Sequence, residues 1–203
     1  DRIGRLLQPV SDEWVTVEGP PRSYLLNYVD ENGEEKGLFP SGRVGLLAAP
    51  GGTGKSFALI DLAVAVATGG SWLNTFPVDS EGGRGRVLLA MAEEDAEEMR
   101  RRLWSAMESR GLTPSQRRAV ASRIDVLPLA GEQCALTKDG NDNDVRTTFA
   151  DALEEALRER VATDDDGWAV LLLDPVSRFA GPDAEKDNAA ATRFIQVLES
   201  LTK

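Results

Sequence analysis

The chain has 203 residues, of which 41% are hydrophobic and 28% charged, as expected for a single globular domain with a sizeable core. Its 23 Lys and Arg residues against 34 Asp and Glu residues give a net charge of −11, which argues against a surface that coats nucleic acid or an anionic membrane. The absence of histidine and the presence of one cysteine exclude histidine-based acid–base catalysis, histidine metal sites and an internal disulfide.

The sequence also indicates a compartment. No stretch reaches the roughly 18 consecutive apolar residues of a membrane helix, and no signal peptide opens the chain. With a single cysteine, we therefore expect a protein of the reducing cytoplasm with no membrane partner. Because the first residue is Asp1 and not Met, we also expect the chain to be a trimmed piece of a longer protein.

Residues 1–42 are expected to form a small N-terminal β extension. Residues 14–17 and 24–29 have the β-branched and aromatic content of short strands. Asn32 and Gly33, after the second segment, favour a tight turn, because both residues tolerate positive φ. We predict a β-hairpin or strand pair that leads into a main domain at residues 43–203.

In the main domain, short apolar runs alternate with amphipathic segments. The predicted strands are at residues 44–48, 87–92, 124–127 and 168–173. The predicted helices are at residues 56–68, 93–107, 145–161 and 194–201, with a further short helix that begins at residue 114. The predicted polar loops are at residues 131–144 and 164–167. The strand runs are apolar throughout, which is typical of strands buried on both faces of a parallel sheet. The alternation predicts an α/β fold with three α/β/α layers and a mostly parallel sheet.

A glycine-rich loop stands between the first predicted strand and helix of this domain. Residues 49–56 read Ala-Pro-Gly-Gly-Thr-Gly-Lys-Ser, which is the Walker A pattern in its usual strand–loop–helix context, with Ala49 in place of the first glycine. Glycines let such a loop curl so that its backbone N–H groups bind phosphate oxygens. The predicted nucleotide-binding residues are Pro50, Gly51, Gly52, Thr53, Gly54, Lys55 and Ser56. A glycine-rich turn with a chance Lys-Ser pair is the simpler alternative.

Two residues are candidates for holding Mg²⁺. The Ser56 hydroxyl follows the phosphate-contacting Lys55, and Asp174 ends the apolar strand Leu171-Leu172-Leu173, as the Walker B carboxylate does. Asp174 has the alternative role of capping the following turn. We expect ATP and Mg²⁺ as the ligands of this site.

Hydrolysis also needs a group that orients or deprotonates water. Pro175 occupies the position directly after Asp174 and cannot act as a base. Glu93 is the better candidate, because it follows the second apolar strand at the sheet edge where the phosphate loop also lies. We predict Glu93 and Lys55 as the catalytic residues. A simple helix-start acid is the alternative for Glu93, and this is the role expected of Glu94 and Asp95.

These motifs resemble the RecA-like ATPases of the RepA-type hexameric replicative helicases, which are AAA family ATPases in the broad sense. The resemblance covers roughly residues 43–201 and rests on the phosphate loop, the strand ending Ala92-Glu93-Glu94-Asp95 and the run Leu173-Asp174-Pro175-Val176-Ser177-Arg178-Phe179. It implies a homo-oligomeric ring of about six subunits, with ATP sites between subunits and single-stranded DNA as a partner. It assigns the catalytic carboxylate to Glu93. Arg178 matches an arginine after the Walker B strand, with a solvated loop arginine as an equal alternative.

The resemblance also implies a further sensor strand and trailing arginines, which we expect beyond Lys203. Two other functions stay open: a nucleotide-gated regulatory ATPase of a replication or mobile-element system without unwinding, and a P-loop kinase. The main concentration of basic residues comprises Arg100, Arg101, Arg102, Arg117, Arg118 and Arg123. We expect it to be a solvated helix face paired with acids, with a DNA track as the alternative, and we expect Trp104 to be a core residue.

Overall fold

The computed structural model describes residues 7–138, 145–162, 167–181, 184 and 186–202. The elements in chain order are α2 (Asp12–Thr16), β1 (Tyr24–Val29), β2 (Glu35–Pro40), α3 (Lys55–Thr68), β3 (Ser71–Trp72), β4 (Phe76–Pro77), β5 (Arg86–Met91), α4 (Ala96–Ser109), α5 (Pro114–Arg123), β6 (Ile124–Pro128), α6 (Thr148–Ala162), β7 (Trp168–Asp174), α7 (Val176–Phe179) and α8 (Asn188–Leu201). None of the helices in the described ranges is long and apolar enough to cross a membrane.

The central sheet has three parallel strands in the order β6-β5-β7. Every residue of β5 is buried, as the uninterrupted apolar run of this strand predicts. The register sets Met91 at the end of β5 opposite Pro128 of β6 and opposite Asp174 of β7. The carboxyl ends of all three strands therefore meet at one edge of the sheet.

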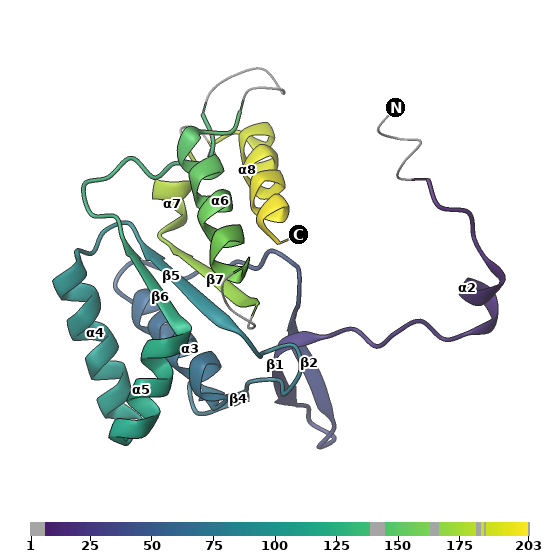
Figure 1. Ribbon diagram of the computed structural model, residues 1–203, viewed down its shortest axis with the longest axis horizontal. Helices are drawn as coiled ribbons and strands as arrows, with labels where there is room; N and C mark the ends of the chain where they lie inside the picture. The colour runs from purple at the N-terminus through teal and green to yellow at the C-terminus, as the bar shows by residue number, and fades with distance from the viewer. Residues whose placement is uncertain (1–6, 139–144, 163–166, 182–183, 185, 203) are drawn as a thin grey trace.

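Side chains on the two faces of β5 enter two different hydrophobic clusters. Val87, Leu89 and Met91 pack in a cluster with residues of α3, α4 and α5. The alternating residues Leu88 and Ala90 pack in a second cluster with residues of α6, α7 and α8. Figure 1 shows these two groups of helices on opposite sides of the sheet. The period of two along a strand accounts for this division.

Most predicted elements of the main domain are confirmed to within a few residues. The strands β5, β6 and β7 and the helices α3, α4, α5, α6 and α8 occupy the expected positions. Thr113 caps α5 with a capping box that involves Gln116, as the Thr-Pro pair indicates. The elements β3, β4 and α7 were not predicted, because segments of two to four residues carry too little periodicity. Parts of the predicted loops, residues 139–144 and 163–166, lie outside the described residues.

The strand predicted at residues 44–48 is wrong. Residues 44–50 have no regular secondary structure, and within the described ranges no strand pairs with them. Leu46 is 69% exposed and Leu47 is 39% exposed. An apolar run becomes a strand only where a neighbouring backbone pairs with it, and sequence composition does not reveal that neighbour. The chain thus enters the glycine-rich loop from an unpaired segment.

The N-terminal region also differs from the prediction. The strand expected at residues 14–17 is wrong, because these residues lie in or next to the short helix α2, with Asp12 and Glu13 in its first turn. Acidic residues there favour a helix start. Figure 1 shows α2 far from the body of the molecule. Further along, β1 and β2 pair antiparallel, with Val29 opposite Glu35 across the turn.

Trp104 is not a core residue, contrary to the expectation. It lies on α4 with 56% of its surface exposed, and the Arg117 guanidinium lies 4.4 Å from its ring centroid. A cation over an aromatic face stabilises such an exposed ring. The other arginine contacts support the expected solvated face, because Arg101 pairs with Glu97 and Glu98.

Gly85 is required where the chain enters β5. It has a φ of +134°, and a Cβ added to it would lie 2.4 Å from the Gly167 carbonyl oxygen. We therefore expect Gly85→Ala to lower the free energy of unfolding by about 2 kcal/mol, through strained backbone and steric overlap. Urea denaturation measures this change. Gly167→Ala is the matched control, because an added Cβ there meets no atom within 4 Å. Equal urea midpoints for the two variants would contradict this explanation.

Candidate functional site

The glycine-rich loop leads directly into α3. Gly52 and Gly54 have positive φ values of 74° and 87°, and Gly54 is the N-cap residue of α3. Residues with a Cβ rarely adopt this left-handed conformation, so the two glycines determine the curl of the loop. The first N–H groups of a helix have no acceptor within the helix and carry partial positive charge. The start of α3 therefore presents backbone donors to an anion.

Lys55 folds back onto the loop that precedes it. Its Nζ donates hydrogen bonds to the carbonyl oxygens of Ala49 at 2.6 Å and Pro50 at 2.8 Å. The Thr53 hydroxyl donates to the same Pro50 carbonyl oxygen at 2.8 Å. Residues 51–54 are all exposed. The ammonium group and the loop backbone are thus accessible to a ligand from solvent.

Ser56 and Asp174, which are 118 positions apart in the sequence, are in contact. The Ser56 hydroxyl donates a hydrogen bond of 2.6 Å to Oδ2 of Asp174. Asp174 is the last residue of β7 and only 9% exposed, and Ser56 lies in the first turn of α3. The sheet therefore brings together the two residues that the sequence predicts as metal ligands.

The donor set fits Mg²⁺ when a phosphate ligand accompanies the ion. Hydroxyl and carboxylate oxygens are ligands that Mg²⁺ accepts, usually one or two from the protein with water and substrate phosphates completing the octahedron. No group of three or more His, Cys, Asp or Glu residues that could hold a metal occurs in the described part of the chain. The chemistry of Ser56 and Asp174 is thus that of a site shared with a nucleotide.

Two glutamates follow β5 and differ in environment. Glu93, the predicted catalytic residue, is exposed, whereas Glu94 is only 7% exposed. The Glu94 Oε1 accepts a hydrogen bond of 2.6 Å from Nη1 of Arg102, and Oε2 has no hydrogen-bond partner. Burial raises the pKa of Glu94 and the carboxylates of Asp174 and Glu93 raise it further, while the Arg102 guanidinium opposes the shift.

Only one of the two residues expected to be helix-start acids has that role. Asp95 is the N-cap of α4 and accepts a hydrogen bond of 2.8 Å from the backbone N–H of Glu98. Glu94 does not serve the helix start and instead turns into the protein beside Arg102. The sequence offers no signal for this, because Glu94 and Arg102 lie eight positions apart and meet only through the path of the chain after β5.

Arg102 connects the end of β5 to the start of α3. Its Nε donates a hydrogen bond of 2.7 Å to Oε1 of Glu98, and its guanidinium lies 5.2 Å from the ring centroid of Phe57. Phe57 directly follows Ser56 in the first turn of α3. Arg102 is thus fixed by an acid on its own helix and by an aromatic ring beside the loop.

Arg178 lies in α7, four residues after Asp174. Its side chain is exposed, and Nη2 donates to the carbonyl oxygen of Glu132 at 3.4 Å. The Cys134 thiol contacts the carbonyl oxygen of Arg178 at 3.6 Å. In this chain Arg178 therefore helps to hold the loop before α6.

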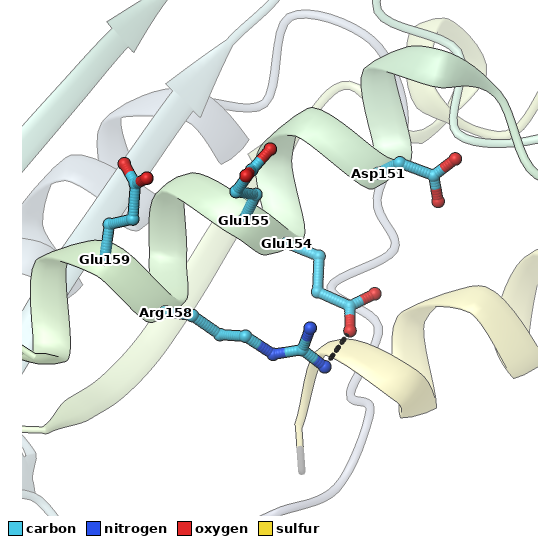
Figure 2. Close-up of a pocket in the computed structure, with 5 residues that line it drawn as sticks. All are labelled: Asp151, Glu154, Glu155, Arg158 and Glu159. Atoms are coloured by element: carbon cyan, nitrogen blue, oxygen red, sulfur yellow. Dashed lines mark hydrogen bonds and ion pairs between the residues drawn. The ribbon is translucent and has the colours of Figure 1, made fainter.

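A hollow elsewhere on the surface runs along α6. Figure 2 shows its five lining residues, all from this helix: Asp151, Glu154, Glu155, Arg158 and Glu159. Glu154 pairs with Arg158, and Glu155 and Glu159 point away from that pair. Arg146 also pairs with Asp151 and Glu154, so four carboxylates stand against two guanidinium groups, and this excess of negative charge disfavours a phosphate ligand. The hollow therefore does not compete with the loop at residues 49–56 as an anion site.

Comparison with known protein families gives a match that spans most of the chain. A family model described as an AAA domain matches residues 5–203 of the chain. The match includes the glycine-rich loop, β5 and β7. No curated protein matches the chain.

The contact between Ser56 and Asp174 generates a prediction about metal dependence. We expect Asp174→Asn to raise the Mg²⁺ concentration needed for half-maximal ATP binding by about 10-fold or more, because a neutral amide replaces a charged oxygen beside the ion. A Mg²⁺ titration of ATP binding by calorimetry measures this. Asp151→Asn, which changes an exposed carboxylate on α6, is the control. A wild-type Mg²⁺ titration for Asp174→Asn would exclude this residue as a ligand.

Proposed function

We propose that the chain, which belongs to the AAA domain family, is the ATP-hydrolysing core of a RecA-like motor of the RepA-type helicase class. The membership is shown by the family's model, which matches residues 5–203. The family indicates a nucleotide-binding ATPase. The hydrogen bond between Ser56 and Asp174 beside the start of α3 is the observation that supports ATP and Mg²⁺ as its ligands. The two hydrophobic clusters on opposite sides of β5 support the three-layer arrangement of such a core.

In this proposal the loop and α3 bind the triphosphate. The backbone N–H groups at residues 51–56 donate to phosphate oxygens, and the Lys55 ammonium exchanges its two carbonyl acceptors for oxygens of the β- and γ-phosphates. Ser56 and Asp174 hold Mg²⁺, which supplies positive charge to the developing negative charge of the phosphoryl group. The Ser56 hydroxyl, which donates its proton to Asp174, has lone pairs that would be available to the ion.

Glu93 is the proposed group for the attacking water. It is exposed at the end of β5, next to the edge where β7 ends at Asp174. Its carboxylate accepts a proton of the water as the water oxygen bonds to the γ-phosphorus. The bond from that phosphorus to the bridging oxygen breaks at the same centre, and ADP and phosphate leave. An exposed carboxylate is suited to a water that enters from solvent.

A specific observation favours the second candidate, a nucleotide-gated regulatory ATPase that does not unwind DNA. Arg101, Arg102 and Arg117 on α4 and α5 each pair with a carboxylate. Guanidinium groups engaged in this way contribute less to a track for DNA phosphates. ATP turnover with and without single-stranded DNA distinguishes the two functions. Stimulation that weakens with added salt supports the helicase class, and unchanged turnover supports the regulatory ATPase.

Lys55→Ala tests nucleotide binding. We expect ATP affinity to fall by about 10- to 100-fold, because the variant loses charge-assisted hydrogen bonds to the phosphates. Calorimetry with ATP and Mg²⁺ measures the dissociation constant. Lys36→Ala in β2 is the control, since Lys36 is an exposed lysine paired with Glu34. ATP affinity that is the same for both variants and the wild type would remove the loop from the proposed function.

Glu93→Gln tests the chemical step. The amide cannot accept a proton, so we expect turnover to fall by about 100-fold or more while ATP affinity stays within about twofold of wild type. Phosphate release at saturating ATP measures turnover. Glu97→Gln provides an exposed-carboxylate control on α4, with an expected wild-type rate. If Glu93→Gln retains the wild-type rate, another residue activates the water.

A further inference from the structure

Glu94 carries a buried oxygen atom that is not explained by the fold. Its Oε2 is buried without a hydrogen-bond partner, while Oε1 is bonded to Arg102. A buried acceptor without a donor has lost its hydration without replacement, and the cost is larger when the acceptor carries charge. Such atoms in native proteins call for an explanation, often a water or an ion. The cost at Glu94 is offset if a donor reaches Oε2 in another state of the protein.

The position of Glu94 indicates which state that is. The backbone N–H of Ala92, two residues earlier, donates a hydrogen bond of 2.8 Å to the carbonyl oxygen of Asp174. The negative charge of Asp174 is close enough to raise the pKa of Glu94. Glu94 is therefore a second buried carboxylate beside the proposed metal ligand. Two buried carboxylates at the same edge of a sheet favour a cation and its bound waters nearby.

Arg102 holds this carboxylate in one orientation. The guanidinium bonds Oε1 of Glu94 and Oε1 of Glu98, and packs over Phe57 next to Ser56. With Oε1 bonded to Arg102, Oε2 is the oxygen of this carboxylate that has no donor, and its lone pairs are free to accept a hydrogen bond. The same contacts connect Glu94 to the first turn of α3, where the phosphate loop ends.

We propose that Glu94, oriented by Arg102, is a second acidic positioning residue of the nucleotide site, whose Oε2 accepts a hydrogen bond from a water bound to Mg²⁺. The inference rests on the proposed ATP and Mg²⁺ site. It separates the two adjacent glutamates by role. Glu94 acts on the hydration shell of the metal, and Glu93 acts on the attacking water. Carboxylates in this outer position orient the ligands of a metal without touching the ion.

The test is a Mg²⁺ titration of the binding of a fluorescent ADP analogue by the full chain. Glu94→Gln keeps an oxygen for Arg102 and places an NH₂ donor at the position of Oε2, where it opposes the water donor. We expect the half-saturating Mg²⁺ concentration to rise by about 10-fold or more. Binding of the analogue in EDTA stays within about twofold of wild type. Glu97→Gln, an exposed carboxylate on α4, retains the wild-type Mg²⁺ midpoint.

A merely structural role for Glu94 gives a different result. If Glu94 only anchors α4 through Arg102, Glu94→Gln lowers the unfolding midpoint and leaves the Mg²⁺ midpoint unchanged, and this outcome overturns the inference. Glu94→Asp is the second variant, for use if Glu94→Gln fails to fold. Aspartate keeps the negative charge, but its side chain is one methylene shorter, so the carboxylate lies further from the site. A raised Mg²⁺ midpoint for this variant supports the inference, and a wild-type midpoint overturns it.

The outcome is distinguishable from failure of the proposed function. If the wild-type chain does not bind the analogue with or without Mg²⁺, the nucleotide site itself is wrong. A different result contradicts only the role of Glu94. In that case the wild type binds the analogue and Lys55→Ala does not, but the folded Glu94 variants have the wild-type Mg²⁺ midpoint.

Discussion

The parallel pairing of β5 with β7 is the constraint on which the site depends. Its register sets Met91 opposite Asp174, so that the residues following β5 lie beside the end of β7. The hydrogen bond from Ser56 to Asp174 then fixes the start of α3 at the same edge. Parallel strands place their carboxyl ends together, and loops at that edge collect functional residues from distant parts of a chain. Without this register the phosphate loop and the acidic residues share no surface.

The sequence predicted the elements whose signals are local. The glycine-rich loop, the apolar strand before Asp174 and the cap at Thr113 each depend on a few neighbouring residues, and all three are where the pattern indicates. Some features that depend on partners elsewhere in the chain were missed. The apolar run at residues 44–48 looks like a strand but has no strand beside it in the described ranges. The predicted metal ligands Ser56 and Asp174 are in contact. The burial of Glu94 was not predicted, because its partner Arg102 lies eight positions further along, on α4.

The charge balance at this edge of the sheet supports the proposal that a metal ion and a nucleotide bind together. Asp174, Glu93 and Glu94 bring three carboxyl groups to one edge of the sheet. Burial raises the pKa of Glu94, and the charges of Asp174 and Glu93 add to this rise against the opposing Arg102 guanidinium. Lys55 and Arg102 supply two cationic groups, and Arg102 already pairs with Glu94 and Glu98. A triphosphate adds further negative charge, so a divalent cation is needed to bring it beside these acids. The site, like the chain as a whole, thus has more acidic than basic side chains.

The hydrogen bonds from Lys55 to the carbonyl oxygens of Ala49 and Pro50 have a consequence for binding kinetics. A glycine-rich loop left to itself samples many backbone conformations, and a ligand that orders it loses affinity to that entropy. Here the two hydrogen bonds from Lys55 hold the loop in one conformation before a ligand binds. In the proposed complex the Lys55 ammonium gives up two hydrogen bonds to carbonyl oxygens and gains about as many to phosphate oxygens. Under the proposed function the loop adds little ordering cost to nucleotide association, so nucleotides of different affinity differ mainly in their dissociation rates.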